Sequence, residues 1–128
     1  MDCVTDTHSI VWYFTDDPRL SRHALEVFEK TTQEGVIIIP SVVLAEIMYI
    51  AGKGKITLTF DQTLQRIDSY ENFIVASLDV EILKVADKIE AKLEMHDKLI
   101  AATALYYNAS LITRNSLITK SGVCTTIW

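Results

Sequence analysis

The stretch Val36-Ile37-Ile38-Ile39-Pro40-Ser41-Val42-Val43-Leu44-Ala45-Glu46-Ile47-Met48 combines a strand, a break and the start of a helix. Val36 to Ile39 is a continuous β-branched run, which is typical of a strand buried on both faces of a parallel sheet. Pro40-Ser41 breaks this run, and Ser41 is predicted to cap a helix that continues through about Ile50. A buried strand followed directly by an apolar helix is the unit from which α/β folds are built.

The same alternation of strand and helix continues on both sides of this stretch. Further strands are predicted at 3–5, 73–76, 110–113 and 123–127. Five further helices are predicted. One covers 7–14, one follows a Ser21 cap, and one covers 60–70 behind a Thr59/Gln62 capping box. Another follows Asp79, and the last runs from Asp97 to near Tyr107. We therefore predict an α/β fold in one domain over residues 1–128, with a central parallel sheet of about five strands and helices on both faces.

Composition narrows the class of protein. Apolar residues make up 49% of the 128 residues, enough for a core. No apolar run approaches the roughly 18 to 20 residues of a membrane span, and the opening residues lack the basic region of a signal peptide, so we expect a cytoplasmic protein without a membrane partner. Cys3 and Cys124 are expected to be buried thiols, and the absence of a CxxC pair argues against zinc held by thiolates.

The net charge of −5 is opposite in sign to that of most nucleic-acid-binding domains. This objection weakens if the acids cluster, because carboxylates that hold a divalent ion no longer present free negative charge to a substrate. Basic residues could still meet phosphates locally. The candidates are Arg19, Arg22, Lys53, Lys55 and Arg114.

Three acids and one amide lie where apolar elements begin or end, or inside one. Asp6 closes the first strand, Glu46 lies inside an apolar helix, Asp97 opens a later helix, and Asn115 follows the fourth strand. Ligand sites in open α/β sheets lie beyond the carboxyl ends of the strands, so these four side chains could converge in one cleft. Such oxygen ligands suit Mg²⁺ or Mn²⁺, and phosphodiester hydrolysis is the reaction that such an ion supports.

Each of these residues also has a plain structural interpretation. Asp6 and Asp97 could cap the helices that follow them, Glu46 could lie on the solvent side of an amphipathic helix, and Asn115 could be a turn residue. His8, His23 and His96 show no metal or nucleophile spacing, although His96 adjoins Asp97 and could line the cleft.

Several motifs, in this order along the whole chain, resemble those of PIN-domain ribonucleases, and among them the VapC toxins of bacterial and archaeal toxin–antitoxin modules. The motifs are Val4-Thr5-Asp6-Thr7-His8-Ser9-Ile10-Val11-Trp12-Tyr13, Asp16-Asp17-Pro18-Arg19-Leu20-Ser21, Pro40-Ser41-Val42-Val43-Leu44-Ala45-Glu46-Ile47, His96-Asp97-Lys98-Leu99-Ile100-Ala101-Ala102-Thr103-Ala104 and Leu111-Ile112-Thr113-Arg114-Asn115, with the terminal Trp128.

The resemblance implies a role for individual positions. Asp6, Glu46 and Asp97 would be the catalytic metal ligands, and Thr113, with Thr7, would support them, Thr113 by a hydrogen bond that orients the acids. Asn115 stands where the family usually has Asp, so a fourth catalytic position carries no negative charge. The resemblance also implies Mg²⁺ or Mn²⁺ as cofactor, an RNA substrate, a homodimer and an antitoxin partner that blocks the site.

The leading hypothesis is therefore a metal-dependent endoribonuclease that acts as the toxin of a type II toxin–antitoxin module and hydrolyses RNA phosphodiesters with metal-activated water. The alternative is a catalytically weakened PIN-like domain that binds RNA or an antitoxin without efficient cleavage, because Asn115 replaces the usual acid. A phosphoacceptor domain of similar layout is disfavoured, because such domains usually carry an acidic pair after the first strand and this chain has only Asp6 there.

Overall fold

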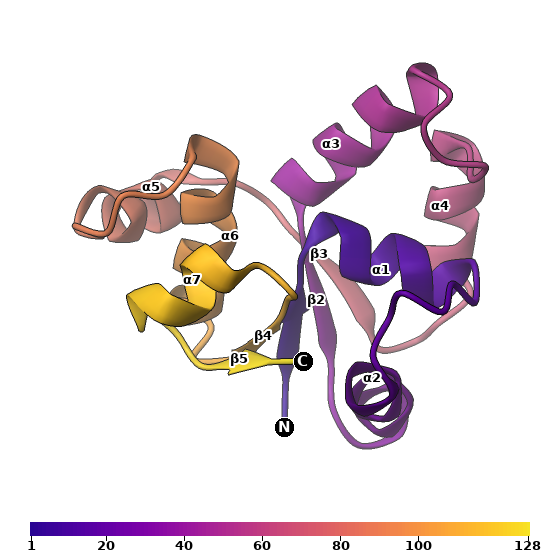
Figure 1. Ribbon diagram of the computed structural model, residues 1–128, viewed down its shortest axis with the longest axis horizontal. Helices are drawn as coiled ribbons and strands as arrows, with labels where there is room; N and C mark the ends of the chain where they lie inside the picture. Colours follow the sequence, from indigo (N-terminus) through magenta and orange to yellow (C-terminus); the bar gives the residue numbers. More distant parts are fainter.

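A five-stranded sheet in the order β3-β2-β1-β4-β5 forms the centre of the protein in a computed structural model that describes residues 1–128 (Figure 1). Every pair of neighbouring strands is parallel. The strands are β1 (Cys3–Thr5), β2 (Ile37–Pro40), β3 (Phe73–Ala76), β4 (Ser110–Ile112) and β5 (Thr126–Ile127). The chain builds outward from β1 to one edge and then returns to build toward the other, so the strand order reverses between β1 and β4. A crevice forms beyond the carboxyl ends of the strands at such a reversal.

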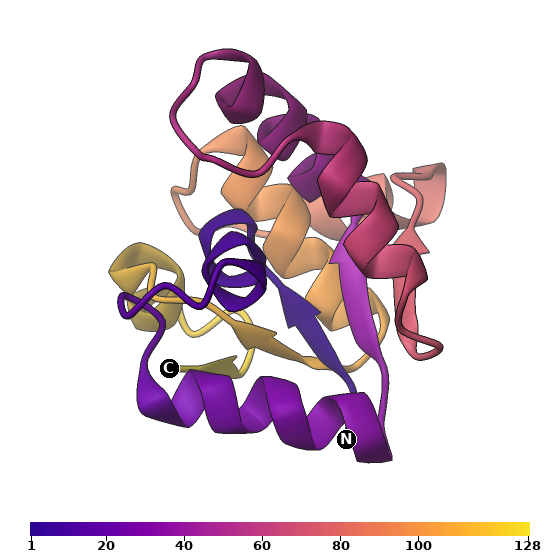
Figure 2. The same ribbon diagram turned by 90° about the vertical axis from the view of Figure 1, so that its right-hand side faces the viewer.

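Seven helices surround the sheet. They are α1 (Thr7–Phe14), α2 (Arg22–Glu34), α3 (Ser41–Gly52), α4 (Phe60–Asp68), α5 (Val80–Asp87), α6 (Met95–Tyr106) and α7 (Ser116–Ser121). In Figures 1 and 2, α1, α2 and α4 lie on one side of β1 and β2, and α5, α6 and α7 lie on the other. The predicted α/β class, with a parallel sheet between helices, is confirmed. None of the helices combines the length and the apolar character needed to cross a membrane.

The apolar core explains why the short strands hold together. A cluster of 23 buried residues joins β1, β2 and β4 to α1 and α2, and a smaller cluster of six lies between α5 and α6. All four residues of β2 are buried, as the continuous apolar run predicts for a strand inside the sheet. In β3, by contrast, Ile74 and Val75 are exposed, because β3 is an edge strand.

Several predicted helix caps are confirmed. Ser21 caps α2, the Thr59/Gln62 capping box opens α4, and Asp79 caps α5. Ser41 does not cap α3, because it is the first helical residue and its Oγ accepts a hydrogen bond from the Leu78 amide at 3.0 Å. Leu78 lies in a distant loop, so a long-range contact displaces the expected local one.

The C-terminal part departs further from the prediction. Helix α6 begins at Met95, so Asp97 lies within the first turn and neither opens nor caps the helix. The fifth strand, expected over 123–127, is limited to Thr126–Ile127, and α7 was not predicted at all. The two cysteines are free thiols, but only Cys3 is fully buried, while Cys124 is half-buried.

Candidate metal and nuclease site

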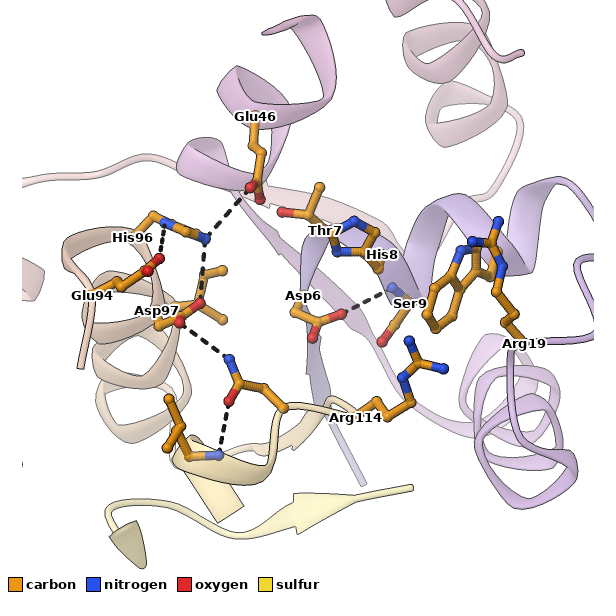
Figure 3. Close-up of a pocket in the computed structure, with 14 residues that line it drawn as sticks. Asp6, Thr7, His8, Ser9, Arg19, Glu46, Glu94, His96, Asp97 and Arg114 are labelled. Carbon is orange, nitrogen blue, oxygen red and sulfur yellow. Dashed lines mark hydrogen bonds and ion pairs between the residues drawn. The ribbon is translucent and has the colours of Figure 1, made fainter. Parts of the chain in front are cut away.

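A cavity of about 560 Å³ lies at the carboxyl end of the sheet and brings the expected acids together (Figure 3). Asp6, Thr7, Glu46, Asp97 and Asn115 all line it, although they come from four separate parts of the chain. The cavity therefore forms where the reversed strand order predicts a ligand site.

Asp6 is held by both of its carboxylate oxygens. It follows β1 and caps α1, with Oδ1 accepting a hydrogen bond from the Ser9 amide at 2.9 Å. Oδ2 accepts a hydrogen bond from the hydroxyl of Thr113. The expected capping role is thus real, and the same side chain also lines the cavity.

Asn115 has its two amide ends turned to different neighbours. Oδ1 accepts hydrogen bonds from the backbone amides of Leu117 and Ile118, at 2.9 and 3.3 Å, and so caps α7. Nδ2 donates to Oδ2 of Asp97 at 3.1 Å. Only an oxygen can accept from two N–H groups, so the helix fixes this orientation. The NH₂ group, not the carbonyl oxygen, faces the acid that lines the cavity.

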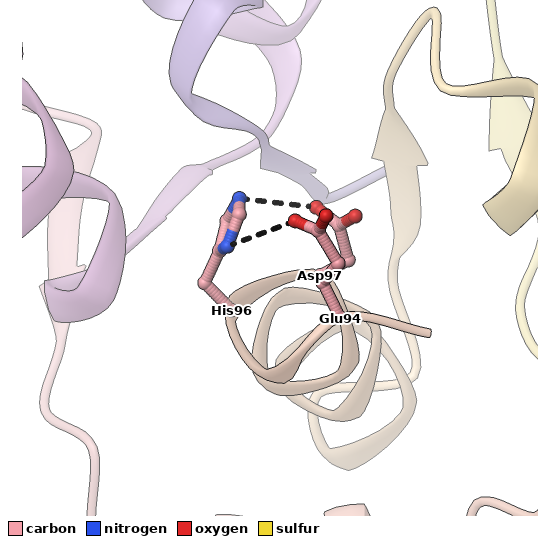
Figure 4. A group of neighbouring side chains, drawn as sticks. All are labelled: Glu94, His96 and Asp97. Carbon is pink, nitrogen blue, oxygen red and sulfur yellow. Dashed lines mark ion pairs between the residues drawn. The ribbon is translucent and has the colours of Figure 1, made fainter. Parts of the chain in front are cut away.

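Asp97 and Glu46 meet around the imidazole of His96. Nε2 of His96 lies 3.3 Å from Oδ1 of Asp97 and 3.5 Å from Oε2 of Glu46. Its Nδ1 lies 3.9 Å from Glu94 (Figure 4). The sequence left the placement of His96 open and gave no sign of Glu94, which enters the site because α6 begins two residues before Asp97.

Burial is the main influence on Asp97, whose side chain is only 15% exposed. Desolvation raises the pKa of Asp97 above its ordinary value, with the neighbouring His96 and the hydrogen bond from Asn115 acting in the opposite direction. A cation held at this carboxylate would relieve that cost, because it favours the ionised form.

The hydroxyl of Thr7 supplies a test of whether a cation fits here. Thr7 is 2% exposed, and its Oγ1 is the buried side-chain polar atom that lacks a hydrogen-bond partner. Figure 3 shows this oxygen directed into the cavity, toward the region between Asp6 and Glu46. A buried polar atom without a partner is costly, so an oxygen left free between the carboxylates of Asp6 and Glu46 fits a hard cation or its hydration shell.

The opposite end of the cavity is basic. Arg19 and Arg114 line it together with Trp12, whereas Arg22, Lys53 and Lys55 do not. The Cζ atoms of Arg114 and Arg19 lie 4.6 and 5.0 Å from the Trp12 ring centroid. The sequence offered all five cations as phosphate contacts and could not choose among them, because the choice depends on where α1 places Trp12.

Comparisons with known proteins agree with this architecture. Solved structures of similar fold include VapBC2 from Rickettsia felis bound to a promoter DNA fragment, at 20% identity, a TM-score of 0.73 and coverage of 99% of this chain and 98% of that one. DNA-bound VapBC from Salmonella typhimurium is 19% identical, with a TM-score of 0.73 and coverage of 99% of this chain and 97% of that one. FitAcB from Neisseria gonorrhoeae is 14% identical, with a TM-score of 0.70 and coverage of 98% of this chain and 96% of that one. A comparison with curated protein sequences finds no match. The family model described as the PIN domain matches residues 3–120, and the chain therefore belongs to the PIN domain family.

Proposed function

We propose that the protein is a metal-dependent endoribonuclease and the toxin of a toxin–antitoxin pair. The observation that carries this proposal is the meeting of Asp6, Glu46 and Asp97 around one cavity that also holds the unpartnered Thr7 hydroxyl. The fold supports it, because the chain is a PIN domain, and similar structures include a toxin–antitoxin complex from Klebsiella pneumoniae at 22% identity and a TM-score of 0.67.

In this proposal Asp6, Glu46 and Asp97 hold Mg²⁺ or Mn²⁺. A divalent ion at such a site supplies positive charge that stabilises a phosphoryl group and lowers the pKa of water. The protein's own contribution is orientation. Thr113 and the Ser9 amide fix the Asp6 carboxylate, and Asn115 fixes one oxygen of Asp97. Thr7 adds a neutral oxygen directed into the cavity.

RNA is the proposed substrate, and an antitoxin protein and a second copy of this chain are the proposed partners. At the cavity a strand would meet both the acids and the arginines that line it, and a protein bound over the cavity would stop cleavage. Similar structures named as VapBC assemblies support the antitoxin as partner.

The decisive experiment incubates the purified chain, free of other proteins, with structured RNAs in Mg²⁺, in Mn²⁺ and in EDTA. We expect cleavage only with the metal, and a loss of at least about a hundredfold in Asp97→Ala, because a missing ligand lowers both metal affinity and activity. Asp87→Ala is the matched control, because Asp87 is exposed on α5 and lies outside the cavity. Cleavage by a folded Asp97→Ala protein at the wild-type rate would sink the proposal.

One observation favours a weaker variant of this function. Because the carbonyl oxygen of Asn115 caps α7, the fourth position offers the cavity neither a charge nor a free oxygen. The chain could then bind RNA or an antitoxin without efficient cleavage. If so, Asn115→Asp should turn on cleavage that the wild-type chain lacks, whereas efficient cleavage by the wild-type chain would rule this variant out.

A further inference from the structure

We propose that Arg114 and Arg19, held against Trp12, bind a backbone phosphate of the RNA next to the one that is cleaved. This inference rests on the proposed nuclease function, and it assigns the strand's position to the basic end of the same cavity. Figure 3 shows both guanidinium groups on one side of Asp6, away from Asp97 and His96.

Trp12 is the support of this basic end. It is 4% exposed, and it contacts the rings of His8 and Trp128, at centroid distances of 5.6 and 6.0 Å. A ring so buried cannot offer a face to a nucleobase. The two guanidinium groups lie over it instead, and cation–π contacts of this kind hold an arginine in place without using its N–H donors.

The two arginines differ in how many donors remain free. Arg19 forms a two-point contact with Asp17, through Nε at 3.1 Å and Nη2 at 2.8 Å. Arg114 is exposed and forms no ion pair with any carboxylate and no side-chain hydrogen bond in the protein. An arginine that is positioned by an aromatic ring and not neutralised by an acid is well suited to a phosphate, which it can bind through two parallel hydrogen bonds.

The polarity of the cavity favours a nucleic-acid strand over an acidic peptide. An RNA strand has phosphates at regular intervals, so one can lie at a cation held by Asp6 and Asp97 while its neighbour lies at Arg114. An acidic peptide would use only the basic end, and the carboxylates at the other end would repel it. The two arginines also explain how a chain with a net charge of −5 can bind RNA, because they place positive charge locally where the strand must pass.

The test measures the binding of a fluorescein-labelled oligouridine by anisotropy in Ca²⁺, which takes the same oxygen ligands, with RNA integrity checked on a gel. We compare Arg114→Gln and Arg19→Gln with Arg22→Gln, whose parent side chain is 93% exposed on α2 and outside the cavity. Loss of one charge-assisted phosphate contact should weaken binding about tenfold in Arg114→Gln. The effect should be smaller in Arg19→Gln, because Asp17 already engages that side chain, and smallest in Arg22→Gln.

The salt dependence gives a second readout. The slope of log K against log salt should fall by about 0.7 in Arg114→Gln, because one phosphate contact with a single strand is lost. Arg114→Lys should keep the slope but bind more weakly, because lysine lacks the planar fork. Circular dichroism of each variant confirms that it is folded.

The outcomes separate this inference from the function on which it rests. If the wild-type chain cleaves RNA and Arg114→Gln binds with the same affinity and slope as Arg22→Gln, the phosphate site is wrong and the nuclease stands. A wild-type chain that neither binds nor cleaves RNA contradicts both.

Discussion

At the scale of single residues, the site contains a carboxylate, that of Asp97, which is buried with little positive charge around it. Asp97 is mostly buried, it receives a hydrogen bond from the neutral amide of Asn115, and the only cationic group that could reach it is the imidazole of His96. The pKa of Asp97 is raised because desolvation disfavours its charge more than these neighbours favour it. Such a carboxylate lowers the stability of the metal-free fold, a feature often found at functional positions.

The consequence can be measured by replacing Asp97 with the isosteric Asn. In the folded protein the pKa of Asp97 is raised, so the folded state holds its proton more tightly than the unfolded chain does. Stability therefore falls as the pH rises from the unfolded pKa through the folded one, and the loss is complete at neutral pH. In EDTA at pH 7, Asp97→Asn should have a higher free energy of unfolding than wild type, and the difference should shrink as the pH falls toward about 4.

Urea denaturation across this pH range checks the prediction. Asp87→Asn, at an exposed position on α5, is the control and should show no such trend. An Asp97→Asn protein that is less stable than wild type at pH 7 would mean that the ionised carboxylate is well compensated, contrary to its surroundings in the cavity.

The sequence predicted the members of the acidic cluster better than their contacts. Asp6, Glu46 and Asp97 could be found because each was expected to end, interrupt or begin an apolar element. The orientation of Asn115 could not, because it depends on the backbone amides of α7, a helix that the sequence did not predict. The free hydroxyl of Thr7 was equally hidden, since burial without a partner is a property of the packed structure.

At the scale of elements, the site is a set of strand ends and helix starts tied together by Thr113. This residue follows β4 and is 1% exposed. Its hydroxyl donates to Asp6, the cap of α1, and accepts from the Asn115 amide at 3.0 Å, at the start of α7. One hydroxyl therefore sets the relative positions of two helices and of two cavity residues.

Thr113→Val should separate this role from packing. The substitution keeps the shape of the side chain but leaves the Asn115 amide without its partner, so we expect a loss of about 1 to 3 kcal/mol in the free energy of unfolding. The turnover rate should fall more than the apparent affinity for RNA, because Asp6 loses its orientation while the arginines stay in place.

Thr103→Val is the matched control, since Thr103 is equally buried but its hydroxyl only returns to the Leu99 carbonyl of its own helix, at 2.8 Å. It should cost less stability and leave cleavage unchanged. Equal effects of the two substitutions on turnover would show that Thr113 does not position the site.

Errors in the predicted elements have two physical causes, which are distant contacts that override local preference and segments too short to show a period. Ser41 has the side chain of a good cap, but its Oγ is used by Leu78 from another loop. Helix α7 is short and polar, so its sequence carries no clear apolar period. It is defined instead by the Asn115 cap and by Gly122, whose φ of 68° suits a residue without a side chain at the helix end.

At the scale of the whole molecule, the alternation of strands and helices was enough to predict a parallel sheet, and the rule for its carboxyl edge was enough to predict that the acids converge. The strand order was not predictable, because it depends on which apolar faces pack together rather than on any one segment. The basic end of the cavity depends on the same packing, since α1 must place Trp12 beside Arg114.

Because acids converge in a chain of net charge −5, we expect the stability of the whole fold to depend on divalent ions. A ligand that binds only the folded state stabilises it by mass action, by about 2.7 kcal/mol at a hundred times the dissociation constant. For a domain of this size that corresponds to a rise of roughly 10 °C in the unfolding temperature. We expect this rise with Mn²⁺ or Mg²⁺ in thermal scans, and its loss in Asp97→Ala.

In Asn115→Asp the rise should begin at a lower ion concentration, because a carboxylate keeps the helix cap while adding a charge beside Asp97. If Asp97→Ala is stabilised as strongly as wild type, the ions bind elsewhere on the acidic surface, and the cavity is not the metal site.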